Sequence, residues 1–281
     1  MRPERLEPML TALEVNRKKL ARNEHSYFDK KKDQKDKIRY YRHINLHMSS
    51  NRKKFIILHQ LITHTHRNKL PYFISKDEFL YTWVDLHPNG AVKNIYSGAE
   101  NDPADLMRLD AKVHAKHEDL DLSEGDVPVD LKFNAEHIVP QSWFGGREPM
   151  KGDLHHLFAC EPKCNATRSN FPYHDFSDYH PESPDEKIRN HCGFASLQLF
   201  EPENGKGTVA RAMLYFILRY PNAIKKSYRK KINFSLLRDW NEQFPPTIYE
   251  QHRNQAIFQI QGNRNPFIDF PELMDRLYFP T

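Results

Sequence analysis

Cysteine is scarce in this sequence, and long hydrophobic runs are missing from it. Three cysteines among 281 residues are too few for a disulfide framework, so we expect a chain held together by its hydrophobic core. The mean hydropathy is −0.80, and no apolar run approaches the roughly 18 residues of a membrane-spanning helix. No apolar signal segment follows Met1. These absences predict a cytoplasmic location without a membrane partner, with non-classical export as the alternative.

Aromatic residues and positive charge are plentiful, and the charge is unevenly distributed. Eighteen Phe, 13 Tyr and 3 Trp supply enough apolar surface for a packed core. Residues 1–57 hold 16 Lys and Arg against 7 Asp and Glu, whereas residues 58–281 carry a net charge of −4. We therefore expect a basic helical extension, 1–57, on a domain of residues 58–281. Such an extension attracts a polyanion; the alternative is a solvated helical face.

The order of the predicted elements indicates an α+β fold with a mainly helical body. Charge-rich residues 9–60 and the apolar patterns near the C-terminus are typical of helices. Proline at position 162 suits the first turn of a helix that runs to about Asn170. Residues between Tyr96 and Pro128 are acidic and typical of a loop. The expected strands are Phe79–Val84, Ala91–Tyr96, Val129–Phe133 and Leu154–Phe158, and the expected late helices are Val209–Tyr220 and 248–260.

Glu136 and His137 directly follow a predicted strand, and two further polar residues lie on the predicted helix after it. Asn165 and Arg168 are three positions apart, so they share one face of that helix. Carboxylate and amide oxygens are ligands that suit magnesium. Taken alone, the Glu-His pair is more typical of a hydrogen-bonded structural histidine.

Several ordered motifs accompany these residues between about residue 58 and residue 279. They are Leu58-His59 with Leu70-Pro71-Tyr72, Ile95-Tyr96-Ser97, Asn134-x-Glu136-His137-x-x-Pro140-x-Ser142, Asp153-Leu-His-His-Leu157, Asn165-x-x-Arg168-Ser169-Asn170, Val209-Ala-Arg-Ala212 and Gln261 to Asp269. Through them the sequence resembles the endonuclease I family, nonspecific nucleases of the ββα-metal (His-Me finger) superfamily. The basic extension is not part of the family pattern.

The resemblance implies a magnesium-dependent, sequence-nonspecific endonuclease that cleaves DNA, with RNA as a further substrate. His137 would be the general base that takes a proton from water, and Glu136 and Asn165 would bind one Mg²⁺. Arg168 and Arg147 would contact the phosphate, because a guanidinium matches phosphate geometry. The products would carry 5′-phosphate and 3′-hydroxyl ends. Asp153 and His156 would support the finger rather than act on the substrate.

Two other functions fit parts of the sequence. A noncatalytic nucleic-acid-binding protein would use the basic extension, but it would not need the trio Glu136, His137 and Asn165. A zinc-based hydrolase is disfavoured, because Glu136-His137 lacks a second histidine at helical spacing.

The three cysteines could hold a structural zinc. Cys160 and Cys164 have a spacing found in zinc ligand pairs, and Cys192 with His191 or His174 would complete a tetrahedral site. The alternatives are buried or free thiols, or a Cys160–Cys164 disulfide in an exported protein.

Overall fold

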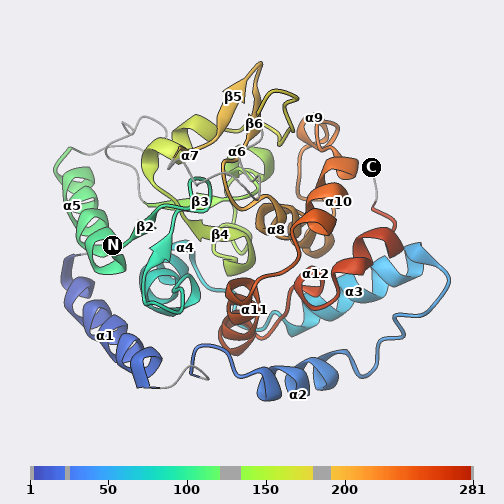
Figure 1. Ribbon diagram of the computed structural model, residues 1–281, viewed down its shortest axis with the longest axis horizontal. Coiled ribbons are helices and arrows are strands. Elements are labelled where there is room, and N and C mark those ends of the chain that lie inside the picture. The colour runs from blue at the N-terminus through green and yellow to red at the C-terminus, as the bar shows by residue number, and fades with distance from the viewer. Residues whose placement is uncertain (1–2, 23–25, 121–133, 180–190, 280–281) are drawn as a thin grey trace.

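Helices dominate the computed structural model, which describes residues 3–22, 26–120, 134–179 and 191–279, without the side chains of 117–120 (Figure 1). The α-helices are α1 (Leu6–Arg22), α2 (Lys30–Tyr41), α3 (Asn51–Thr65), α4 (Tyr72–Ile74), α5 (Pro103–Leu120), α6 (Gln141–Phe144), α7 (Pro162–Arg168), α8 (Lys206–Arg219), α9 (Lys226–Arg229), α10 (Phe234–Gln243), α11 (Ile248–Gln261) and α12 (Pro266–Asp269). The other helices are of two kinds. Three are 3-10 helices, η1 (Pro3–Arg5), η5 (Leu154–His156) and η6 (Pro271–Arg276), and one is the π-helix η3 (Ser75–Val84).

Strands form three antiparallel pairs in the described part of the chain. The first pairs β1 (Val92–Lys93) with β2 (Glu100–Asn101), the second β3 (Ala135–His137) with β4 (Leu157–Ala159), and the third β5 (Phe194–Ser196) with β6 (Leu199–Glu201). A mainly helical α+β fold is therefore confirmed.

Helix α8 lies in the interior, and Figure 1 shows other helices around it. All of its residues except Thr208 are buried, because its sequence is apolar nearly all round. It packs against α3, α10, α12 and η5. At Gly207 an added Cβ would lie 2.3 Å from the carbonyl oxygen of Phe244, so only glycine permits this close approach. The helix thus connects the body to η5, which directly precedes β4.

Two of the expected elements are wrong. The predicted strand Phe79–Val84 is part of η3, where the buried Leu80, Tyr81 and Val84 fall at helical spacing. The acidic stretch expected to be a loop contains α5, which begins at Pro103 after Asp102 accepts a hydrogen bond from the backbone of Ala104. A helix start signal was therefore present but overlooked.

Other expectations are confirmed in part. The expected strand 91–96 is reduced to β1, and Leu154–Phe158 divides into η5 and the start of β4. The expected strand Val129–Phe133 lies outside the described residues. The late helices and the helix after residue 161 are present.

The N-terminal extension is helical but it packs on the body along the lower edge of Figure 1. Tyr27 is buried, stacks on His252 with ring centroids 4.1 Å apart, and donates a hydrogen bond to the carbonyl of Leu86 (2.9 Å). Arg17 donates to the carbonyl of Gly90 (3.0 Å). The boundary expected after residue 57 falls inside the continuous helix α3. None of the helices in the described ranges is long and apolar enough to cross a membrane.

Candidate active site

Strands β3 and β4 and helix α7 form a compact β-β-α unit. The two strands are antiparallel, with Glu136 opposite Phe158. Helix α7 begins at Pro162, and the side-chain amide of Asn165 donates a hydrogen bond to the backbone carbonyl of Ala135 (3.0 Å). This contact joins the helix to the strand immediately before Glu136. The unit therefore places Asn165 beside the strand that carries Glu136 and His137.

The Glu136 carboxylate is buried beneath two tyrosines. Tyr96 donates its hydroxyl hydrogen bond to Glu136 (2.8 Å), and the Tyr96 and Tyr173 hydroxyl oxygens are 3.0 Å apart. The Glu136 side chain is about one-twentieth exposed. Burial raises the pKa of Tyr96, with the adjacent carboxylate acting in the same direction, so the phenol stays a hydrogen-bond donor. The carboxylate is held in place by neighbours from distant parts of the sequence.

Arg168 is fully buried beside Glu136. Its Nε lies 3.6 Å from the Glu136 carboxylate, and its Nη2 donates to the carbonyl of Ile138 (2.8 Å). The guanidinium lies 5.2 Å from the centre of the Tyr173 ring. Burial alone would lower the pKa of Arg168, but the nearby phenols and the carboxylate outweigh it and raise the pKa. In this arrangement Arg168 fixes the carboxylate, and its contact with substrate phosphate stays a prediction.

His137 projects to the other face of β3, as neighbouring residues of a strand do. Its Nε2 lies 2.8 Å from the backbone carbonyl of Lys151, so this nitrogen carries the proton that is donated. The Nδ1 atom then keeps its lone pair and lies 3.4 Å from the side-chain amide of Gln141. Burial lowers the pKa of His137 to about 3, so the imidazole is neutral at physiological pH. Glu136 and His137 therefore have separate sets of partners.

Arg147 lies in the loop that also supplies the His137 partner. The residue is exposed, and its backbone carbonyl accepts a hydrogen bond from the backbone of Lys151 (3.1 Å). An exposed guanidinium near this loop is accessible to a phosphate, so its predicted role is compatible with its position.

Asp153 directly precedes η5 and is buried, and the resemblance predicts a supporting role for it. Tyr215 and Tyr220 donate hydrogen bonds to its carboxylate (2.8 and 3.0 Å), and Gln261 donates another (3.0 Å). Burial alone would raise the pKa of Asp153, but the nearby histidines, His66 foremost, and the hydrogen bond from Gln261 outweigh it and lower the pKa. His156, next to β4, lies within 2.6 Å of the carbonyl of Met150. These contacts fix the turn that leads into β4.

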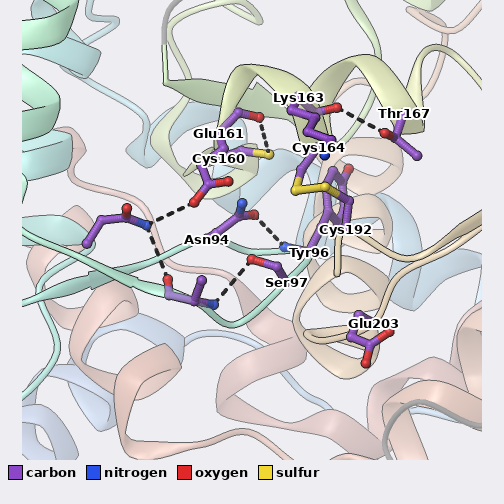
Figure 2. The surroundings of a disulfide bond; sticks show 12 residues. Asn94, Tyr96, Ser97, Cys160, Glu161, Lys163, Cys164, Thr167, Cys192 and Glu203 are labelled. Atoms are coloured by element: carbon purple, nitrogen blue, oxygen red, sulfur yellow. Dashed lines mark hydrogen bonds between the residues drawn. A yellow bond between two sulfur atoms is a disulfide. The ribbon is translucent and has the colours of Figure 1, made fainter. Parts of the chain in front are cut away.

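The zinc prediction is wrong, because two of its three cysteines bind each other. Cys164 and Cys192 form a disulfide across 28 positions of sequence, as Figure 2 shows. Disulfide sulfurs carry no thiolate to donate to a metal. Cys160 is a buried free thiol that contacts the carbonyl of Glu161 (3.5 Å), and burial raises its pKa. The His174 ring packs edge-on against Phe176, with ring centroids 4.6 Å apart.

The disulfide connects the helix of the unit to the segment before β5. Cys164 directly precedes Asn165 in α7, and Cys192 lies two residues before Phe194. The pairing differs from the Cys160–Cys164 alternative, which would have closed a loop within one turn of chain. The bond therefore restrains the helix that carries the Asn165 amide.

The β-β-α unit offers a metal ion the side-chain oxygens of Glu136 and Asn165. Among the described residues no group of three or more His, Cys, Asp and Glu could hold a metal ion. Glu136 and Asn165 nevertheless offer one carboxylate and one amide. The Asn165 amide oxygen accepts no hydrogen bond from the described residues, since only its nitrogen contacts the strand. This donor set fits magnesium, which keeps most of its waters and takes few protein ligands.

The tyrosines that position the carboxylates of Glu136 and Asp153 were not predicted from the sequence. Tyr96 lies in one of the motifs quoted for the resemblance, but it received no role. Tyr173, Tyr215 and Tyr220 gave no signal, because their partners are remote in sequence.

Comparison with known protein families accounts for most of the chain. Residues 54–272 match the family model described as Endonuclease I. The chain belongs to the Endonuclease I family. The match begins inside α3, so α1 and α2 precede the part that the family shares.

Curated relatives of this family member are bacterial nucleases. An extracellular deoxyribonuclease of Aeromonas hydrophila is 32% identical over 155 residues, which cover 48% of this chain and 64% of that protein. An extracellular ribonuclease of Bacillus amyloliquefaciens is 29% identical, with 52% and 54% covered. A periplasmic deoxyribonuclease of Aeromonas hydrophila is 31% identical, with 48% and 62% covered. The chain thus spans between half and two thirds of the length of these relatives.

The expected cytoplasmic location is contradicted by these relatives. The expectation depended on a missing signal segment, whereas the relatives are named extracellular or periplasmic. The disulfide agrees with the correction, because such bonds persist in oxidising compartments.

Proposed function

We propose that this chain is a magnesium-dependent, sequence-nonspecific endonuclease. Its substrate is DNA, and the proposal includes RNA because one relative is named a ribonuclease. The observation that carries the proposal is the β-β-α unit, whose strand holds Glu136 and His137 and whose helix holds Asn165, in a chain of the Endonuclease I family.

His137 is the proposed general base. Its Nε2–H is donated to a backbone carbonyl, which fixes the ring and leaves the Nδ1 lone pair to accept a proton from water. Gln141 lies beside that nitrogen and would orient the water. The water oxygen forms a bond to phosphorus as the bond from phosphorus to the 3′ oxygen breaks, and the leaving 3′ oxygen takes a proton from solvent water, which gives 5′-phosphate and 3′-hydroxyl ends.

Glu136 and Asn165 would hold the magnesium ion. The bound ion supplies positive charge against the phosphate oxygens as negative charge develops on them. Tyr96 and Arg168 keep the Glu136 carboxylate in one orientation, so that little reorganisation is needed when the ion binds. Arg147 is exposed and would contact the phosphate, because a guanidinium matches phosphate geometry.

A plasmid-nicking assay tests the activity. We expect purified protein to convert supercoiled DNA to open circles with Mg²⁺ present, and to stop when EDTA is added. His137→Ala should lower the rate by on the order of a hundredfold or more. His64→Ala, which changes an exposed histidine of α3, is the matched control and should keep the rate.

The product ends provide a second readout. Nicked plasmid should be resealed directly by DNA ligase, because ligation requires a 5′-phosphate beside a 3′-hydroxyl. Metal-independent cleavage, ends that ligase rejects, or a His137→Ala variant with the wild-type rate would each refute the mechanism.

We also propose that the protein functions outside the cytoplasm. The support is the naming of the relatives and the Cys164–Cys192 disulfide. Thiol titration of denatured protein tests whether this bond forms in an oxidising compartment. One thiol per chain, from Cys160, is expected after export to a bacterial periplasm, and three thiols would contradict the proposal.

A further inference from the structure

The charges of α2 are segregated between two faces of the helix. The inner face packs on the C-terminal part of the body and on α3. Its members are Asp33, Lys37, Tyr40 and Tyr41. Arg264 pairs with Asp33 (2.9 Å), and Lys37 donates to the carbonyl of Asp269 (2.5 Å). Further along this face, Tyr40 contacts Thr65 (2.7 Å) and Tyr41 donates to Asp269 (2.8 Å). The helix is therefore docked in a fixed orientation.

The outer face carries a line of cations, which we name the α2 stripe. Its members are Lys31, Lys35, Arg39 and Arg42, all of them exposed. Their spacing of four, four and three residues places them on one side of the helix, opposite the docked face. At 1.5 Å per residue the stripe is about 16 Å long, with neighbouring charges about 6 Å apart.

No ion pair among the described residues includes a member of the α2 stripe. The ion pairs of this part of the chain lie on the inner face, where Asp33 meets Arg264, and Asp29 caps the start of α2. Asp36 lies at the border between the two faces and forms no ion pair with the described residues. Like charges at this spacing destabilise a helix. An external anion would relieve this repulsion.

A nucleic-acid backbone is the anion whose shape fits. It presents negative charge at regular intervals along each strand, at roughly one phosphate per 3.4 Å of axis, so several phosphates lie within the length of the stripe. Lysine and arginine contacts to phosphate position a protein without reading bases, which suits a substrate of any sequence. A free anion or a small ligand would engage only one or two of the four cations.

We propose that the α2 stripe is a second docking surface for the nucleic-acid substrate, outside the β-β-α unit and outside the region that the family shares. The inference rests on the proposed nuclease function for the identity of its ligand. The surface binds phosphates before and after cleavage alike. Binding that is equal in the ground state and the transition state lowers KM and leaves kcat unchanged.

Duplex binding at varied salt tests the surface directly. The test protein carries His137→Ala, so that a 60-base-pair duplex stays intact, and the stripe variant adds Lys31→Gln, Lys35→Gln, Arg39→Gln and Arg42→Gln. Each neutralised phosphate contributes about 0.9 to the slope of log affinity against log salt. The loss of affinity between 50 and 200 mM salt should therefore be smaller in the stripe variant by a factor on the order of a hundred.

Two control variants distinguish the loss of a docking surface from the loss of net positive charge. The dispersed variant Lys19→Gln, Lys53→Gln, Lys112→Gln and Lys226→Gln removes the same charge from α1, α3, α5 and α9, and it should keep the salt slope. The exchange variant, with Lys31→Arg, Lys35→Arg, Arg39→Lys and Arg42→Lys, should also keep it. Circular dichroism checks that α2 remains folded.

Cleavage kinetics complete the test in chains that retain His137. The stripe variant should raise KM for the long duplex about tenfold or more and keep kcat. Equal salt slopes in the stripe and dispersed variants would overturn the proposal, as would binding to phosphatidylserine vesicles without binding to DNA. A wild-type chain that binds duplex through the stripe but never cleaves it would refute the nuclease function and leave the docking surface standing.

Discussion

The β-β-α unit and the N-terminal helices present their charged groups in opposite ways. In the unit, Glu136 and Arg168 are buried and touch fixed partners. In α2, Lys35 and Arg39 are exposed on a helix whose other face is docked. Chemistry on a substrate requires groups held in one geometry, whereas attraction of a polyanion requires charges that solvent and ligand can reach. The comparison shows that the chain keeps these two kinds of charged group in separate segments.

The two segments also differ in how they are held. The unit depends on a disulfide and on the buried Asp153 carboxylate, both of which join residues far apart in sequence. The N-terminal helices are docked by side-chain contacts with no covalent link, such as those of Tyr27 with His252 and of Asp33 with Arg264. Changes that remove one kind of support should therefore leave the function of the other segment intact.

Removal of the disulfide should have the largest effect. In Cys164→Ser with Cys192→Ser the closed loop of 28 positions is lost, which should lower the free energy of unfolding by roughly 3–4 kcal/mol. Helix α7 loses its connection to the segment before β5, so cleavage should decline as well. Urea unfolding and plasmid nicking measure both effects.

The comparison makes this prediction specific. Salt-dependent duplex binding at the α2 stripe should be unchanged in the double serine variant, because α2 is docked on Arg264, Thr65 and Asp269, none of which belongs to α7 or to the segment before β5. Cys160→Ala serves as the control for loss of a buried sulfur. Unchanged stability after loss of the disulfide would show that the body alone holds the unit.

Asp153→Asn should have the next largest effect. The substitution weakens three hydrogen bonds to a buried charge, and we expect a loss of roughly 2–3 kcal/mol of stability at pH 7. Asp105→Asn, at an exposed carboxylate of α5, should cost less than about 0.5 kcal/mol.

The pH dependence of unfolding supplies a separate check. The pKa of Asp153 is lowered in the folded state, so its contribution is complete above the ordinary pKa of about 3.9 and is lost as the pH falls below that value. Wild-type stability should therefore decline more steeply than that of Asp153→Asn as the pH falls from about 5. Parallel profiles would contradict the assigned contribution.

Much of the fold could be predicted where one local signal determines an element. Pro162 marked the start of α7, and the apolar residues of α8 indicated a buried helix. The π-helix η3 was missed because its short apolar run fits a strand as well as a helix. Its conformation depends on packing against α1 and β4, which no local pattern reveals.

The candidate site shows the same division. Glu136, His137 and Asn165 are selected through the motifs of the family resemblance, because their residue types and spacing alone favour a structural histidine, and their roles stay predictions. The burial of Arg168 and the choice of Cys192 as the partner of Cys164 could not be predicted, since both depend on segments brought together by folding. The extension was predicted as helical, but its docking depends on residues such as His252 more than 200 positions away.

Removal of one tyrosine hydroxyl near the β-β-α unit, and of another in the N-terminal extension, should have the smallest effects on stability. The two variants should nevertheless differ clearly in the magnesium dependence of cleavage. Tyr96→Phe takes a hydrogen bond from the Glu136 carboxylate, and Tyr27→Phe takes one from the Leu86 carbonyl. Each should lower stability by roughly 1–2 kcal/mol, because each leaves a buried acceptor with one donor fewer. Only Tyr96→Phe should also lower kcat and raise the Mg²⁺ concentration needed for half-maximal cleavage, since the carboxylate loses its orientation. Guanidinium unfolding and a magnesium titration of cleavage measure both properties. If the two variants had the same magnesium dependence, Tyr96 would be no more than a packing residue, and the contrast between a positioned site and a docked extension would not extend to single hydroxyl groups.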